Sequence, residues 1–237
     1  MRKIAIIVAL VLVLGGAFAM SAQAYDMTLQ ELIDLGSTGV QIDDKVFYDF
    51  DYDGIAFGGA AAIPADGIAV TFLNDANNPG LQFQAPWSVS ANQGLDSLIQ
   101  YKVAVLKGGN PIVDVSASML GYGFSGGGGV AVGETVKLDS TTIASLYLHA
   151  DSTGTVDSDT AIFDPTLGIL YVVKDISVVG GAVVDGQVVP LVDSEEGSAT
   201  VSVVINRFSE VPVPPSALLL GSGLLGLVGL RFRRKLS

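Results

Sequence analysis

Beyond Gly36, apolar and polar side chains alternate with period two in a series of short runs. Such alternation, in segments rich in Val, Ile and Tyr, is typical of half-buried strands. The runs are residues 46–53, 67–73, 81–87, 97–106, 112–120, 130–138, 143–149, 168–179, 182–189 and 199–208. Clusters of Gly, Asn and Pro separate the runs, and no run alternates with a helical segment, which argues against a parallel sheet. We therefore predict an all-β fold, an antiparallel, jelly-roll-like β-sandwich.

One short helix is expected ahead of the strands. Thr28 is followed three residues later by Glu31, the spacing of a capping box in which each side chain binds a free backbone amide of the first turn. Leu29, Leu32 and Ile33 share one face of this helix, and Gly36 is positioned to end it. So short a helix needs tertiary support, and we expect it to pack across one end of a sheet.

The N-terminus has the pattern of a secretory signal peptide. Arg2 and Lys3 precede an apolar stretch, residues 4–14, and small residues lead to Ala22 and Ala24 of an A-x-A cleavage site. This pattern predicts a signal-peptide helix that is removed after residue 24. The alternative is an uncleaved anchor, since residues 4–20 are nearly long enough to span a bilayer.

The C-terminus, residues 211–237, has three parts. The first is a proline motif that cannot be helical, made of Val211, Pro212, Val213, Pro214 and Pro215. Residues 217–230 carry no charge and would form a helix of roughly 21 Å, short for a membrane span. A basic stop that favours the cytoplasm follows, made of Arg231, Arg233, Arg234 and Lys235. We predict a short transmembrane helix; a buried core helix would leave the prolines and the basic end unexplained.

The chain is thus divided into a signal peptide (residues 1–24), a body (residues 25–210) and a C-terminal segment (residues 211–237). All 24 acidic residues and only six of the 12 basic ones lie in the body, which has a formal charge of −18. Such a surface repels nucleic acid and anionic lipid, and it attracts divalent cations or basic partners. The chain has no cysteine, which excludes disulfides and thiol chemistry.

One motif in the body points to calcium. Asp49, Asp51 and Asp53, followed by Gly54, match the start of a D-x-D-x-D-G calcium loop, although Ala60 stands where the twelfth-position carboxylate belongs. The alternative is a strand with three aspartates facing outward and Tyr48, Phe50 and Tyr52 facing inward. Ca²⁺ is the only cofactor that the sequence suggests.

Two further segments are expected to be loops. An acidic cluster is placed in a polar loop between strands, where it could also bind Ca²⁺; it consists of Asp151, Asp157, Asp159 and Asp164. Residues 121–129 contain six glycines and are predicted to form a mobile loop.

The residues for catalysis are few, and no catalytic site is predicted. His149 is the single histidine, no G-x-S-x-G motif accompanies it, and a zinc site needs more His or Cys ligands. We expect His149 to be an ordinary strand residue. The acidic pairs at 43–44 and 195–196 have no defined separation of the kind that glycoside hydrolysis needs. Trp87, Tyr101 and Tyr122 could form a sugar-stacking face, although packing in the core is the commoner role of such residues.

The C-terminal arrangement resembles the PEP-CTERM sorting signal of Gram-negative bacteria. Val211-Pro212-Val213-Pro214 stands where the family has Val-Pro-Glu-Pro, and Val213 in place of the Glu is similar to the Val-Pro-Leu-Pro-like variants. A short Gly/Leu helix and a basic end follow, as in the family. In the body, residues 29–33, 44–47, 80–83 and 97–101 look like segments found in many such proteins.

The resemblance implies export through the Sec translocon and recognition of the tail by an exosortase, a membrane cysteine protease-transpeptidase. It implies transient anchoring in the inner membrane, then residence at the cell surface or in the extracellular matrix, with exopolysaccharide or biofilm as partner. We therefore expect an exported, non-enzymatic surface or matrix protein. The alternative is a surface module that binds a glycan or calcium, and a secreted hydrolase is a third possibility.

Overall fold

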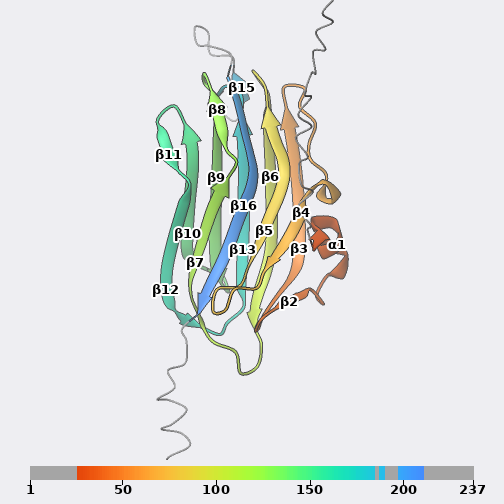
Figure 1. The fold of residues 1–237 in the computed structure, drawn as a ribbon, viewed down its shortest axis with the longest axis vertical. Coiled ribbons are helices and arrows are strands. Elements are labelled where there is room, and N and C mark those ends of the chain that lie inside the picture. Colours follow the sequence, from red (N-terminus) through yellow and green to blue (C-terminus); the bar gives the residue numbers. More distant parts are fainter. Residues whose placement is uncertain (1–25, 185–186, 190–196, 211–237) are drawn as a thin grey trace, which may run out of the picture.

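The chain forms two antiparallel β-sheets packed face to face, as the alternation predicts (Figure 1). The structure, a computed structural model, describes residues 26–184, 187–189 and 197–210, with side chains described except at 182–189. The predicted signal peptide and C-terminal transmembrane helix both lie outside the described residues. Within the described part, no helix is long and apolar enough to cross a membrane.

Sheet A contains seven strands, six of them in the order β1-β4-β5-β16-β7-β12, with β8 paired to β16. Their bounds are β1 Met27–Thr28, β4 Ala69–Leu73, β5 Gly80–Val89, β16 Ser198–Glu210, β7 Ile112–Leu120, β12 Ser158–Thr166 and β8 Gly123–Ser125. The last described strand, β16, therefore lies in the middle of this sheet, between β5 and β7.

Sheet B also has seven strands, in the order β11-β10-β9-β13-β6-β3-β2. Their bounds are β11 Gly154–Val156, β10 Thr141–Asp151, β9 Gly129–Leu138, β13 Leu170–Val179, β6 Gly94–Val105, β3 Lys45–Phe57 and β2 Val40–Ile42. A separate hairpin is formed by β14 Ala182–Val184 and β15 Gln187–Val189, and η1 (Ala65–Gly67) is a single 3-10 turn. The chain crosses repeatedly between the two sheets, which ties them into one domain.

The core lies between the sheets and is rich in aromatic side chains. Phe47, Phe83 and Trp87 are fully buried, and Tyr101 stacks on Phe50 with 5.3 Å between ring centroids. The Trp87 indole donates to Ser97 Oγ at 3.0 Å, which gives its polar atom a partner in the interior. Trp87 and Tyr101 are thus core residues, as their commoner role suggested, and neither can form a sugar-stacking face.

Helix α1 (Leu29–Leu35) has the predicted caps and the predicted packing. Thr28 Oγ1 accepts from the Glu31 amide at 3.2 Å, and the Glu31 carboxylate accepts from the Thr28 amide at 2.7 Å. Leu29 and Leu32 are fully buried, and the Gly36 amide donates to the Ile33 carbonyl at 3.0 Å where the helix ends. The helix lies beside β3 at one edge of the sandwich (Figure 1).

A β-bulge corrects the prediction for strand β3. The register with β6 shifts between Tyr48 and Asp51, and Asp49 has a left-handed φ of 51°. Phe50 faces the core, as predicted, and Tyr52 is partly buried against it. Tyr48 lies on the opposite side, because the inserted residue reverses the alternation, and Phe47 is buried in its place.

Two predicted loops contain strands. The prediction that the acidic cluster between residues 151 and 164 lies in a loop is wrong, because β11 occupies 154–156 and β12 occupies 158–166. Asp151 ends β10, and Asp159 and Asp164 lie within β12, the edge strand of sheet A. The glycine-rich segment at 121–129 likewise contains β8, which pairs with the start of β16.

The Trp87–Ser97 contact gives a stability prediction. Ser97→Ala leaves the indole N–H without its partner in the core and should lower the free energy of unfolding by about 1–3 kcal/mol. Denaturant titration followed by the fluorescence of Trp87, the single tryptophan, measures this directly. The control Ser88→Ala, on an exposed position of β5, should change stability by less than about 0.5 kcal/mol. Equal stabilities of the two variants would show that the contact is dispensable.

Candidate functional site

The outer face of sheet B, the face turned away from the core, carries the site that the structure favours. Five adjacent strands, β3, β6, β13, β9 and β10, place outward side chains in rows that cross the sheet. Two adjacent rows matter here. One contains Asp53, Leu98, Asp175, Gly133 and Tyr147, and the other contains Ile55, Asp96, Ser177, Ala131 and His149. We call the part of this face formed by β6, β13, β9 and β10 in these two rows the trough.

An aromatic pair forms one wall of the trough. Tyr147 on β10 has an exposed fraction of 58%, high for so large a side chain in the middle of a long strand. Its ring stacks on His149, two residues further along, with 5.6 Å between ring centroids and 25° between ring planes. His149 Nδ1 is buried and has no hydrogen-bond partner among the described residues. His149 is a strand residue, as predicted, but its position beside the exposed Tyr147 ring was not predicted.

Two small residues form the floor of the trough. Gly133 lies directly opposite Tyr147, and Ala131 lies directly opposite His149 on β9. A Cβ added at Gly133 would have no atom within 4 Å, so the space above this glycine is open. The small floor lowers the surface beside the aromatic wall and leaves open space next to Tyr147.

Carboxylates form the opposite wall. Asp175 on β13 is exposed and separated from Tyr147 by strand β9 alone, so the walls are roughly 10 Å apart, twice the spacing of strands. Asp96 on β6 is the diagonal neighbour of Asp175 on the same face. Partial burial, together with a hydrogen bond to Asp175 and its negative charge, raises the pKa of Asp96 to about 7. Near neutral pH the pair therefore both donates and accepts hydrogen bonds.

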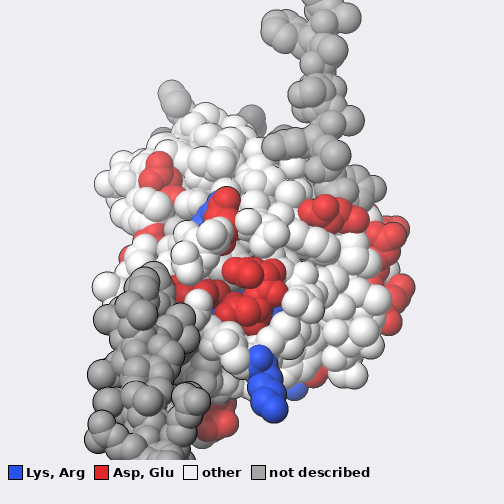
Figure 2. Space-filling model, turned by 60° about the horizontal axis from the view of Figure 1, so that its bottom comes forward, with Lys and Arg blue, Asp and Glu red and all other residues white. Residues whose placement is uncertain are grey.

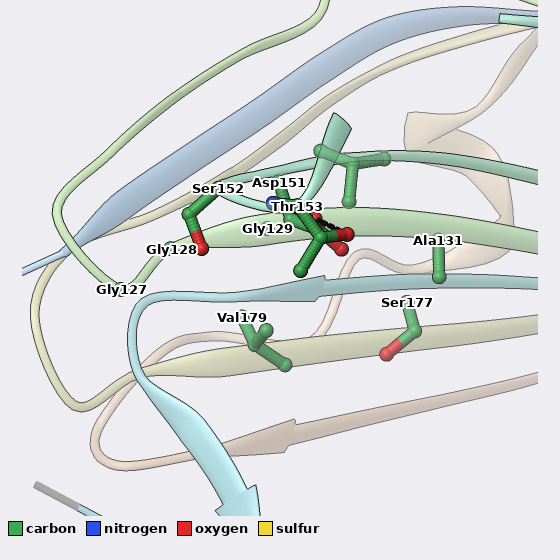
Figure 3. Close-up of a pocket in the computed structure, with 10 residues that line it drawn as sticks. Gly127, Gly128, Gly129, Ala131, Asp151, Ser152, Thr153, Ser177 and Val179 are labelled. Atoms are coloured by element: carbon green, nitrogen blue, oxygen red, sulfur yellow. Dashed lines mark hydrogen bonds between the residues drawn. The ribbon is translucent and has the colours of Figure 1, made fainter. Parts of the chain in front are cut away.

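A pocket of about 320 Å³ continues the trough towards one end of the sandwich (Figure 3). Ala131 and Ser177 belong to both, and the rest of the lining includes Gly127–Gly129, Asp151–Thr153 and Val179. Asp151 accepts from the Thr153 hydroxyl at 2.6 Å and from its amide at 2.7 Å. These contacts, the hydroxyl first, hold the pKa of Asp151 below its usual value and keep it ionised. The pocket thus combines a polar rim with a glycine floor.

The three aspartates of the predicted calcium motif are not brought together as a set. Asp49 is paired with Lys102 at 3.0 Å, while Asp51 and Asp53 are exposed on β3. Among the described residues, one trio of acidic groups has oxygens within 4.8 Å of one another, namely Asp43, Asp44 and Glu210. The bulge at Asp49 explains the separation, because it changes the direction of that side chain relative to the next two.

Two members of the trio, Asp44 and Glu210, are paired with a lysine. Lys45 is fully buried and forms ion pairs with Asp44 and, at 2.5 Å, with Glu210. Asn110 completes the cluster by donating its backbone amide to Asp44 at 2.6 Å and its side-chain amide to Glu210 at 3.0 Å. Figure 2 brings this end of the sandwich forward and shows acidic side chains gathered on it. The Lys45 ammonium already supplies the positive charge that these carboxylates need, so the cluster fastens β3 to the end of β16.

The sequence did not reveal the trough. Tyr147 is one alternating residue among many, and nothing in its surroundings along the chain marks it as exposed. Tyr122, a predicted sugar-stacking residue, instead donates its hydroxyl to Asp157 at 3.0 Å. The one sequence feature that could have indicated the trough is the pair of small residues Ala131 and Gly133 in β9. Which side chains lie beside them, however, follows only from the strand register.

Comparisons with known proteins add little to this geometry. No family model matches the chain, and no curated protein matches it. A solved carbohydrate-binding module, TmCBM61 in complex with β-1,4-galactotriose, is similar with a TM-score of 0.30 and 10% identity, over 78% of this chain and 99% of that one. The mannan-recognising module TmCBM27 has a TM-score of 0.29 and 12% identity, over 71% and 99%.

The enzymatically active domain of tailspike protein 4 of bacteriophage CBA120 is similar with a TM-score of 0.25 and 12% identity. That likeness covers 72% of this chain and 20% of the tailspike chain. Scores and identities this low indicate neither common function nor common ligands, so the functional argument depends on the residues of the trough alone.

The Asp96–Asp175 pair predicts a pH dependence of stability. Because the pKa of Asp96 is about 7 in the folded protein against 3.8 as its ordinary value, the folded state holds an extra proton between these values. Stability should therefore fall as pH rises from about 4 to 7. Asp96→Asn should remove this fall. At pH 8 its free energy of unfolding should exceed that of the natural protein by about 1 kcal/mol, a small gain since the pair is half exposed, and it should unfold at a higher temperature.

Thermal unfolding at pH 4, 6 and 8 measures this difference. At pH 4 the variant and the natural protein should agree, and Asp164→Asn, at an exposed position of β12, should show no comparable pH-dependent gain. If Asp96→Asn were stabilised by the same amount at all three pH values, the folded state would not hold the extra proton on Asp96.

Proposed function

We propose that this chain is an exported, non-enzymatic β-sandwich protein of the cell surface or extracellular matrix that binds a glycan in the trough of sheet B. The observation that carries the proposal is Tyr147, exposed by 58% beside an open glycine floor and facing carboxylates across one strand. A flat aromatic side, a small floor and a polar wall are the elements that sugar recognition requires.

Each part of the trough suits one part of a sugar ring. An aromatic ring offers an apolar face against which the C–H side of a pyranose can pack. The hydroxyls of the same sugar need acceptors and donors at the rim, which Asp175, the protonated Asp96 and Ser177 supply. The spacing of roughly 10 Å between the walls admits one sugar unit lying across β9.

The charge of the trough restricts the glycan. Asp96, Asp175 and Asp151 carry or share negative charge, and Asp53 extends it across the sheet. Such a surface repels a uronic-acid or sulfated polymer and favours a neutral or amino-sugar glycan. The calcium-binding alternative has less support, because two carboxylates of the described trio, Asp44 and Glu210, are already paired with Lys45.

The ends of the chain support delivery to the cell exterior. The signal-peptide pattern and the PEP-CTERM-like tail fit transport by the Sec translocon and recognition by an exosortase. Glu210, the last described residue before the proline motif, lies at the end of the sandwich opposite the pocket at Gly127–Gly129 (Figure 1). A chain held in the membrane through residues 211–237 could therefore keep the trough free for a polymer.

Glycan binding should depend on Tyr147. Tyr147→Ala removes the stacking surface, and we expect its affinity for exopolysaccharide oligosaccharides from the native host to fall about tenfold or more. Isothermal titration calorimetry of the mature protein measures this. Ile162→Ala is the matched control, because Ile162 is 81% exposed on β12 of the other sheet, and it should bind as the natural protein does.

Equal loss in both variants would mean that binding is not located in the trough. Absence of heat with both neutral and amino-sugar oligosaccharides, in a protein with its natural unfolding temperature, would overturn the glycan proposal itself.

Export and sorting predict the mass of the mature protein. Removal of residues 1–24 and of the C-terminal helix should leave a chain that begins at Tyr25 and lacks residues 217–237. Intact-mass spectrometry of protein isolated from the native host tests this. A mature chain that still contains residues 217–237 would contradict exosortase processing, whatever the result of the glycan titration.

A further inference from the structure

A buried polar trio stands in the middle of the core, on the opposite face of sheet B from the trough. Lys174 on β13 and Glu134 on β9 lie directly opposite each other and face inward from sheet B. Asn206 faces them from β16 in sheet A. The exposed fractions of Lys174 and Asn206 are 0%, and that of Glu134 is 3%.

Glu134 bridges the other two side chains. One carboxylate oxygen, Oε2, forms a short ion pair with Lys174 Nζ, and the other, Oε1, accepts from Asn206 Nδ2 at 2.6 Å. A single carboxylate thus holds an amine and a carboxamide next to each other across the two sheets. The remaining oxygen of the carboxamide, Asn206 Oδ1, is buried and has no partner among the described residues.

The surroundings of the trio exclude water. The inward residues two positions away on the same strands are apolar, with exposed fractions of at most 1%: Val132, Val136, Val172, Ile176, Val204 and Phe208. Tyr101 is also fully buried, and its hydroxyl has no partner within the part of the chain that the structure describes. Burial, followed by the charge of Glu134, raises the pKa of Tyr101 well above the usual value. A buried ion pair stabilises the folded protein little more than apolar side chains of the same volume would. Stability alone therefore does not explain why these residues are here.

We propose that Lys174 and Asn206 are joined by an intramolecular isopeptide bond and that Glu134 transfers the protons that this reaction requires. Glu134 takes a proton from the Lys174 ammonium within their hydrogen bond, which leaves a neutral amine. The Nζ lone pair then attacks Asn206 Cγ, and a buried amine without hydration is a competent nucleophile.

The reaction is completed by loss of ammonia. The new Nζ–Cγ bond forms, and Glu134 hands its proton to the departing Nδ2, with which it is already hydrogen bonded, so that the Cγ–Nδ2 bond breaks and ammonia forms. Glu134 then takes a second proton from Nζ, which becomes the nitrogen of a neutral secondary amide. One lysine ammonium and one asparagine carboxamide thus give one secondary amide and one ammonium ion, because the departing ammonia carries off the second proton and Glu134 returns to its carboxylate. No oxidant, metal or cofactor takes part.

A second trio in the same protein has similar residues and a different environment. Glu210 also bridges a lysine and an asparagine, Lys45 and Asn110. There, however, Lys45 contacts a second carboxylate, Asp44, and donates to the Asn110 backbone carbonyl at 3.1 Å. Lys45 thus has two carboxylate partners instead of one, and the partly exposed Asp44 admits solvent, so we expect no bond at this site.

The bond would take the place of a disulfide. The chain has no cysteine, and β16, which leads to the C-terminal segment, is held to sheet B by side-chain packing. A covalent link from β16 to β13 would fasten the two sheets together and restrict the unfolded chain as a disulfide does.

Peptide mapping tests the proposal on the mature protein. After denaturation, trypsin should fail to cleave after Lys174, and residues 138–207 should appear as one peptide lighter than its sequence by about 17 Da, the mass of ammonia. The exposed Lys102 should be cleaved normally. Cleavage after Lys45 and an unmodified Asn110 should show that the second trio carries no bond.

Glu134→Gln is the matched variant, since it keeps the size of the side chain and removes the proton transfer. It should restore both the full mass and cleavage after Lys174. A natural protein with the full mass and normal cleavage after Lys174 would overturn the proposal without any variant, so a failure of Glu134→Gln to fold leaves the test intact. The same mass loss in Glu134→Gln would show that Glu134 has no part in the reaction.

Discussion

The structure depends on the alternation of side chains across strands of about ten residues, because this places one continuous apolar layer between two sheets. Every other residue of β5, β6, β9, β13 and β16 enters that layer, and most are Val, Ile, Leu or aromatic. The polar exceptions therefore stand out. Lys174, Glu134 and Asn206 meet at the middle of the layer, and Lys45 and Glu210 meet at its end, so each group fastens β16 to the opposite sheet.

The same alternation creates the trough on the other side of sheet B. The residues that leave the core at Tyr147, Gly133 and Asp175 are neighbours only because three strands from different parts of the chain are paired in register. A shift of one residue in β9 would turn Gly133 inward and bring Glu134 to the surface. The buried Lys174–Glu134 pair opposes that shift, since it would leave Lys174 without its carboxylate. The buried Lys174–Glu134 pair and the trough thus both depend on the same register of β9.

The strand pattern, the capped helix and the acidic body could be predicted from the sequence because period, capping residues and charge are local properties. The bulge at Asp49 could not, since a left-handed aspartate leaves no mark on a run of alternating residues. The strand at 158–166 was not predicted, because its acidic residues are typical of a loop. In the structure, Asp159 on this strand accepts a hydrogen bond from the Tyr147 amide. The trough and the buried trio depend on register and on the facing sheet, which no single segment encodes.

The central claim is that a glycan binds in the trough of sheet B. The most direct test is nuclear magnetic resonance of the isotope-labelled mature protein, titrated with oligosaccharides from the exopolysaccharide of its native host. The account predicts that the amide signals that move are those of Ala131, Gly133, Tyr147, His149 and Ser177, while those of the outer face of sheet A stay in place. Signals that move on sheet A alone, or none that move at millimolar oligosaccharide, would contradict it.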